Sequence, residues 1–424
     1  MKESVLHFIW QYKLFNSPFD ALKTIDGEEV EVIDIGRYNS DSGPDFFNAK
    51  IKIAGTVWAG NVEFHQRSSD WKRHQHQLTK AYDNVILHIV EKVDADVFRT
   101  NGEKIPQMVF RNLADLQSRY DDLLKNITWI PCENKIHQIE VFQLQAWKNY
   151  LLTERLEQKT TAVANVLEAF ENNWEEAFYV LLARSFGFGV NNQPFEQLAK
   201  SLPLAVIAKH KDNLFQLEAL LFGQAGLLNV EMVDLYLNQL QKEYHFLQIK
   251  YNLKSMEQSL WKLLRLRPDN FPHIRLAQFA QLIFTSSKLF SKILEQKNIQ
   301  QLRHLFVCEV SDYWKNHYLF GKMSKPSIKR MGNNSIDILL INTVIPFLFA
   351  YGTKKGDQNL VERALDYMEK IPAEKNSVVL KWNQLGVVAA NAFDSQALLQ
   401  LKKNYCDEKK CLRCRIGHQI LTLK

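Results

Sequence analysis

The fold of the first part of the chain is decided by GPDFFNAKIKIAGTVWAGNVEFH, residues 43–65. Within it, residues 49–53 (AKIKI) and 56–65 (TVWAGNVEFH) are typical of two strands. Ala54 and Gly55 between them predict a tight turn. The stretch is therefore expected to form a β-hairpin.

The segments around this hairpin predict further helices and strands. Residues 4–15 carry apolar side chains on one stripe, which indicates an amphipathic helix. Residues 85–90 (VILHIV) are typical of a strand that is buried on both faces. Further elements are expected as a strand at 27–36, a helix at 69–82 and a second hairpin at 96–110. Together they predict an α+β domain, a mixed sheet with flanking helices.

From about residue 141 onward the sequence is typical of helices. Successive segments have helical periodicity, and loop signals such as RPDNFP at 267–272 separate them. No fixed repeat period is evident. The predicted organisation is an α+β domain at 1–130, a large all-α domain at 131–400 and a basic, cysteine-rich tail at 401–424.

The composition is that of a globular protein. The chain has 424 residues, of which 46% are hydrophobic and 24% charged, so it is too apolar for a disordered protein. No apolar run reaches the roughly 18 residues that span a bilayer. The first residues lack the cleavage site of a secretory signal. We therefore expect no membrane partner and a cytoplasmic location.

The net charge of +6 is unevenly distributed. Residues 1–130 carry 16 Lys and Arg against 19 Asp and Glu, whereas residues 401–424 carry seven basic and two acidic residues. The mild overall excess is weak support for a nucleic-acid partner. The local distribution is more informative than the total.

Two acidic residues mark the start and end of the predicted hairpin. Asp45 and Glu63 fall on strands that pair, so their carboxylates are expected to be neighbours on one sheet face. Two adjacent carboxylates repel one another unless a cation lies between them, and Mg²⁺ or Mn²⁺ suits oxygen ligands. His65 points to the same face as Glu63 and is placed to orient an attacking water.

This pattern resembles the PD-(D/E)xK nuclease superfamily over residues 1–110. The resemblance implies a restriction-endonuclease-like fold and metal-dependent hydrolysis of phosphodiester bonds in DNA or RNA, with Asp45 and Glu63 as metal ligands. This sequence has His65 where the family usually has lysine, and a neutral histidine is a weaker electrostatic clamp. The alternative is a non-catalytic nucleic-acid- or protein-binding module on a degenerate nuclease fold.

Several segments are also similar to the DUF2851 family, a group of uncharacterised bacterial proteins. They lie along nearly the full chain: GPDFFNAKI at 43–51, WAGNVEFHQRSSDWKRHQH at 58–76, YDNVILHIV at 82–90, RPDNFPHIR at 267–275, INTVIPFLFAYG at 341–352 and NYCDEKKCLRCRIG at 404–417. This resemblance implies family membership and no particular activity.

Basic and imidazole side chains follow the hairpin closely. Arg67, Lys72, Arg73, His74 and His76 are candidates for binding a phosphate backbone. The alternative is a solvated helix face.

A third hypothesis joins the histidines instead of the basic residues. His65, His74, His76 and His88 would form a transition-metal site together with Asp70 or Glu63. Their spacing matches no zinc signature. If the segment is helical, His74 and His76 lie on different faces.

Three cysteines cluster in the tail, Cys406, Cys411 and Cys414. Thiolates at this spacing are typical of a zinc site or an iron–sulfur cluster. The fourth ligand would be His418, which is near in sequence, or Cys132. A 4Fe–4S cluster on one upstream and three C-terminal cysteines resembles the plan of some PD-(D/E)xK nucleases. Three reduced thiols packed as small apolar groups are the alternative.

Overall fold

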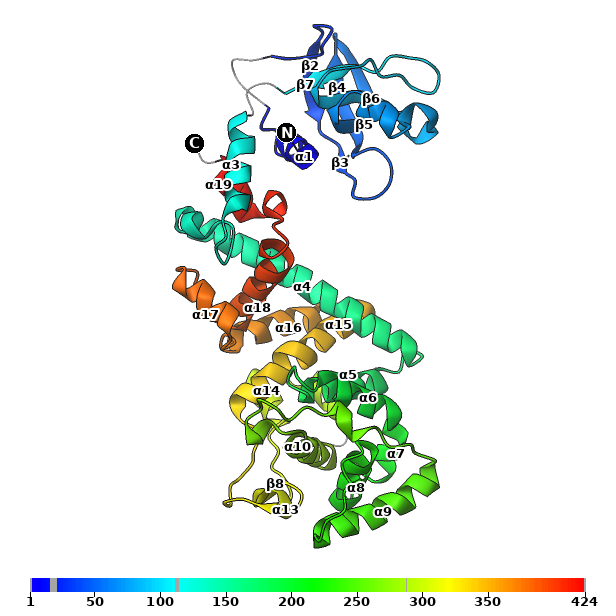
Figure 1. Ribbon diagram of the computed structural model, residues 1–424, viewed down its shortest axis with the longest axis vertical. Coiled ribbons are helices and arrows are strands. Elements are labelled where there is room, and N and C mark those ends of the chain that lie inside the picture. The colour runs from blue at the N-terminus through cyan, green and yellow to red at the C-terminus, as the bar shows by residue number, and fades with distance from the viewer. Residues whose placement is uncertain (1, 16–20, 111–113, 287, 423–424) are drawn as a thin grey trace. The chain divides into compact units, whose positions relative to one another are not determined.

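The computed structural model describes residues 2–15, 21–110, 114–286 and 288–422. The chain divides into two compact units. Unit 1 comprises Met1–Trp147 and Lys402–Lys424, and unit 2 comprises Lys148–Leu401. Figure 1 shows the strands of unit 1 in blue and cyan and the helices of unit 2 in green to orange. The basic tail, expected from the sequence as a separate part, is grouped with the N-terminal residues.

Within the described residues, unit 1 contains a mixed sheet of seven strands. Their bounds are Leu22–Lys23 (β1), Glu29–Asp34 (β2), Arg37–Tyr38 (β3), Phe46–Ile53 (β4), Thr56–Arg67 (β5), Val85–Lys92 (β6) and Gln107–Val109 (β7). The order is β1-β2-β4-β5-β6-β7, and β3 also pairs with β4. The pairs β5–β6 and β6–β7 are parallel, and the others are antiparallel. The predicted mixed sheet is therefore confirmed.

The two ends of this strand order meet. Thr24, directly after β1, forms an antiparallel bridge with Met108 of β7. The N–H of Ile25 donates to the carbonyl of Gln107 at 2.9 Å. The sheet is thus nearly closed and barrel-like, which leaves little free strand edge.

The predicted hairpin forms from β4 and β5. Ile53 pairs with Thr56, and Ala54 and Gly55 turn the chain with φ of 47° and 83°. Helix α1 (Glu3–Gln11) contacts β5 and β6 and buries Leu6, Ile9 and Trp10 among its apolar residues. The helix ends at Gln11, several residues before the predicted end.

The helix expected over residues 69–82 is broken. Helix α2 covers only Asp70–Arg73, and two short 3₁₀ turns follow at His76–Leu78 and Lys80–Tyr82. Gln75 has a left-handed backbone with φ of 61°, which ends α2. Trp71 is fully buried in a cluster with Val85, Val97 and Ile105, so it anchors the segment on the sheet.

The rest of unit 1 is helical and contains the tail. Its elements are α3 (Ala114–Lys125), η3 (Glu133–Gln138), the π-helical turn η7 (Lys402–Cys406), η8 (Cys411–Arg413) and α19 (Arg415–Thr422). Helix α19 packs against α3 and η3. It buries Ile416, Ile420 and Leu421, so it contributes to the core of unit 1.

Unit 2 is largely helical, as the sequence predicts. Helix α4 (Val141–Ala169) leads into it. The bounds of the others are Trp174–Phe186 (α5), Asn192–Ser201 (α6), Leu204–Lys209 (α7), Leu214–Gln224 (α8), Leu235–Tyr251 (α9), Pro272–Thr285 (α10), Leu289–Glu295 (α11), Ile299–His304 (α12), Asp312–Lys315 (α13), Asn333–Leu339 (α14), Ile345–Lys355 (α15), Gln358–Lys370 (α16), Ser377–Gln384 (α17) and Ala392–Leu401 (α18). Several begin at an Asn or Asp cap that accepts a backbone N–H, such as Asn173, Asp234 and Asp357.

One helical stretch of unit 2 is more apolar than the sequence analysis expected. Residues Asn333–Lys355, which span α14, the π-helical turn at Leu340–Val344 and α15, are long and apolar enough to cross a membrane by length and composition. However, 72% of its apolar window is buried within the structure. A helix that is apolar all round is also typical of the core of a large domain.

Candidate metal site

Asp45 and Glu63 are neighbours because of the β4–β5 register. Phe46 pairs with Val62, which places Asp45 beside Glu63. The backbone N–H of Asp45 donates to Glu63 Oε2 at 3.1 Å, and the N–H of Phe64 donates to Asp45 Oδ2 at 3.0 Å. Each carboxylate is therefore held by the backbone of the other's strand.

His65 lies next to Glu63 on the same face of β5. Its side chain is only 2% exposed, and its Nε2 is 3.8 Å from Glu63 Oε1. Residues two apart on a strand share a face, so this proximity follows directly from the sequence spacing.

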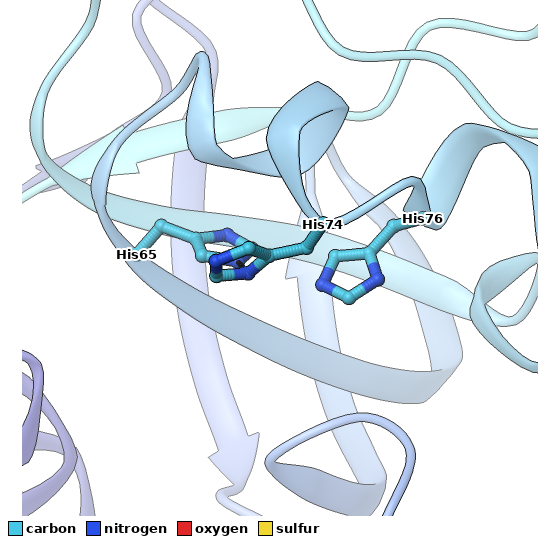
Figure 2. Close-up of side chains that lie close together, drawn as sticks. All are labelled: His65, His74 and His76. Atoms are coloured by element: carbon cyan, nitrogen blue, oxygen red, sulfur yellow. Dashed lines mark hydrogen bonds between the residues drawn. The ribbon is translucent and has the colours of Figure 1, made fainter.

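The break in the helix after Arg73 brings two more histidines to this position. His74 Nδ1 is 3.0 Å from His65 Nε2, and His76 Nε2 is 3.4 Å from Glu63 Oε1. Figure 2 shows the rings of His65, His74 and His76 gathered together, the first from β5 and the others from the segment after α2. One donor nitrogen from each ring lies within 4.8 Å of the other two.

One metal-ligating atom of this cluster lacks a hydrogen-bond partner. His76 Nε2 is buried and has no hydrogen-bond partner among the described residues. His65 Nε2 and His74 Nδ1 form one hydrogen bond at 3.0 Å, in which one nitrogen donates and the other accepts. Buried polar atoms are normally paired, so a cation among His65, His74, His76 and Glu63 would satisfy His76 Nε2.

His88 contacts the second ring nitrogen of His65, Nδ1. On the parallel strand β6, His88 Nε2 is 2.8 Å from His65 Nδ1. If His65 Nδ1–H donates to His88, then His65 Nε2 presents a lone pair toward His74 Nδ1 and Glu63 Oε1, where a cation could bind it. A ligand histidine commonly donates its other N–H in this way.

The protonation states fit a cation site. Burial is the main cause that lowers the pKa of His65 to about 2, of His76 to about 4 and of His88 to about 3. Burial, and then the charge of Asp45, raise the pKa of Glu63 to about 9. Without a cation, Glu63 is thus protonated at neutral pH.

A second group of donors adjoins the first, and one of its members, His7, was missed by the sequence analysis. His7 Nε2 of α1 lies 3.2 Å from Asp45 Oδ2, and Glu3, His7 and Asp45 have donor atoms within 4.8 Å of one another. Burial, followed by Asp45, raises the pKa of Glu3. The signal was the spacing Glu3-x3-His7, which places both residues on one face of a helix.

The predicted phosphate-binding residues differ in exposure. Arg67, Lys72, Arg73 and His74 are exposed, whereas His76 is buried. Arg73 pairs with Asp70 at 3.0 Å. Asp70 also accepts the backbone N–H of Arg67 at 3.0 Å. It therefore braces the turn and is not brought into the histidine cluster.

The cysteines of the tail gather with Cys132 in unit 1. Cys132, Cys406, Cys411 and Cys414 line one small pocket and are free thiols. His418 points elsewhere, since its ring stacks on Tyr12 with centroids 4.1 Å apart. Of the two candidates for a fourth ligand, only Cys132 lines the pocket.

The chain matches the family model DUF2851, "Protein of unknown function", over residues 3–377. This range includes all residues of the candidate metal site and Cys132, and it ends before the three cysteines of the tail. Neither the curated proteins nor the solved structures contain a match to this chain. Since the match covers most of the sequence, the chain belongs to the DUF2851 family.

Proposed function

We propose that this protein is a divalent-metal-dependent hydrolase that cleaves phosphodiester bonds in DNA or RNA. The observation that carries the proposal is the convergence of Glu63, His65, His74 and His76, with Asp45 beside them, in one side-chain cluster of unit 1. Most of these donors are buried, and His74 at the exposed edge gives access from solvent.

The donor set indicates which metal the site prefers. Three imidazoles and one carboxylate suit a transition metal such as Mn²⁺ or Zn²⁺, whereas Mg²⁺ prefers an all-oxygen set. We therefore favour Mn²⁺ or Zn²⁺ over Mg²⁺ and assign His65 as a ligand instead of a residue that orients water. Such a metal lowers the pKa of a bound water and stabilises charge on a phosphate.

Asp45 has a distinct place in the proposal. Glu63 presents Oε1 to the histidines and Oε2 to the backbone of Asp45. It thus lies between the histidine cluster and the group formed by Glu3, His7 and Asp45. Two adjoining cation positions that share one carboxylate are a common arrangement for phosphodiester cleavage. We assign Asp45 to the second position, where it would hold a cation or accept a proton from water.

A nucleic-acid substrate is proposed from exposed positive charge near the cluster in the sequence. Arg67, Lys72 and Arg73 are exposed, and the Arg73 guanidinium lies 3.5 Å from His74 Nε2. Such side chains are suited to phosphate oxygens. The PD-(D/E)xK resemblance remains part of this proposal. It rests on the order α1, β2, β4, β5, α2, β6 and on Asp45 and Glu63 within the β4–β5 hairpin.

The first prediction tests the proposal by substitution of Glu63. Purified protein supplied with Mn²⁺ or Zn²⁺ is expected to cleave at least one class among labelled single- and double-stranded DNA and RNA. Glu63→Gln should lower the rate at least about 100-fold, because loss of a ligand costs more than loss of a residue that merely supports one. The measurement is product formation on denaturing gels.

Glu31→Gln is the matched control for this substitution. Glu31 lies on β2 of the same unit, and its side chain is 69% exposed, so the variant should cleave at the wild-type rate. If wild type and Glu63→Gln bind nucleic acid equally and neither cleaves it, the protein is a binding module and the hydrolase proposal fails.

A further inference from the structure

We propose that Cys132, Cys406, Cys411 and Cys414 bind one metal centre through four thiolates, as zinc or as an iron–sulfur cluster. This site lies apart from the histidine cluster and does not depend on the proposed hydrolase activity. Its ligands come from two segments of unit 1, the loop before η3 and the tail from η7 to α19.

The lining of the pocket selects for a soft metal. Besides the four cysteines it contains Pro131, Tyr405 and Gly417. No carboxylate or imidazole among the described residues lines it, so sulfur is the donor atom offered by four side chains. An all-cysteine set is typical of structural zinc and of iron–sulfur clusters, and it excludes the hard ions Mg²⁺ and Ca²⁺.

The backbone around Cys414 also suits a bound thiolate. The N–H groups of Ile416 and Gly417, at the start of α19, donate to the Cys414 sulfur. Backbone N–H groups that point at a sulfur stabilise its anionic form. Gly417 is required for this approach, because a methyl group there would collide with the carbonyl of Cys411.

The segment that carries Cys406 is also shaped unusually. Residues Lys402–Cys406 form a π-helical turn, a conformation that is rare and frequent at functional sites. Lys409, between Cys406 and Cys411, has a left-handed backbone with φ of 52°. The three tail cysteines that follow from this backbone path line the same pocket as Cys132.

The test is metal analysis of the full chain purified without oxygen. His65→Ala/His76→Ala serves as the background, so that metal at the histidine cluster does not contribute. A brown protein with roughly four iron atoms and four acid-labile sulfides per chain indicates a cluster. A colourless protein with about one zinc per chain indicates a zinc site. Either result supports the proposal.

Cysteine variants in the same background decide which residues hold the metal. Cys132→Ser and Cys414→Ser should each lose at least about nine-tenths of it, since a three-thiolate site is incomplete. Cys308→Ser is the control, because Cys308 is a buried cysteine of unit 2 and should leave the content unchanged.

Two outcomes would overturn the proposal. One is His65→Ala/His76→Ala protein without zinc, iron or sulfide after anaerobic purification. The other is full metal retention in both Cys132→Ser and Cys414→Ser. A global folding defect is separated from ligand loss by circular dichroism of each variant and by chelation of the metal from the His65→Ala/His76→Ala protein, which should lower the melting temperature while the sequence stays the same.

Discussion

At the scale of single residues, the proton on Glu63 controls the candidate metal site. His65 and His76 are already neutral at pH 7, because burial lowers the pKa of each well below that value. Glu63 is the exception, with a pKa raised to about 9. A metal that binds all three must therefore displace one proton, and that proton comes from Glu63.

The second prediction follows from this proton. At pH 7.5, binding of Mn²⁺ or Zn²⁺ should release about one proton per site from Glu63. The apparent affinity should rise up to about tenfold per pH unit and level off near pH 9, since the raised pKa keeps the competing proton bound below that pH. Calorimetric titrations in two buffers of different ionisation enthalpy measure the proton count.

Glu63→Gln provides the contrast. Its amide carries no titrating proton, so binding should be weaker and should release almost none. Equal proton release by wild type and Glu63→Gln would show that another group titrates, and the assignment of Glu63 would fail.

At the scale of elements, strand β5 positions the site through its contact with β6. Gly60 of β5 packs closely on the start of β6, because a Cβ at this position would lie 2.5 Å from Asn84 O and in collision with Ile86. Glu63, His65 and His88 all lie further along the same pair of strands. A side chain at Gly60 is therefore expected to push these strands apart and to disturb the histidine contacts.

The third prediction concerns this close approach. Gly60→Ala should destabilise unit 1 by about 1–3 kcal/mol, because an added methyl in a packed site forces the backbone apart. It should also weaken metal binding. Urea unfolding measures the first effect and metal titration the second.

Gly332→Ala is the control for this substitution. Nothing lies within 4 Å of an added Cβ at Gly332, so both quantities should stay near their wild-type values. A Gly60→Ala protein that unfolds at the wild-type urea concentration would contradict the packing argument.

Some elements of the site follow from the sequence and others do not. Two strand-like segments, 49–53 and 56–65, joined by the Ala54-Gly55 turn predicted the hairpin, and the two-residue period of a strand placed His65 beside Glu63. The position of His76 was not predictable, because the pattern at 69–82 favours a continuous helix that Gln75 breaks with a left-handed backbone. His7 was missed because its contact with Asp45 depends on how α1 packs on the sheet, which no local pattern specifies.

At the scale of the whole molecule, unit 1 is assembled from two distant parts of the chain. The sequence predicted the change from a mixed sheet to helices, since the hydrophobic period changes near residue 141. It did not predict that residues 402–424 group with the first unit. That grouping depends on long-range burial of residues such as Leu412 and Leu421, and a local pattern carries no information about their partners.

The fourth prediction is that unit 1 requires the tail. A chain truncated after Leu401 loses α19, which packs against α3 and η3, and exposes their apolar surface. Calorimetry should show a transition lost or lowered by at least about 5 °C, since loss of several buried side chains costs a few kcal/mol. Unit 2 should keep its own transition. Two unchanged transitions would show that the tail is dispensable.

Because the tail belongs to unit 1, this unit can be completed only after the ribosome has synthesised unit 2. Residues 148–401 are all made before the last segment of unit 1 emerges. At about 5–20 residues per second, this leaves the N-terminal sheet without its final helix for on the order of 10–50 s. During this time unit 2 is synthesised while the N-terminal sheet is still incomplete. We therefore expect chaperones to bind mainly to the N-terminal part of the chain during synthesis.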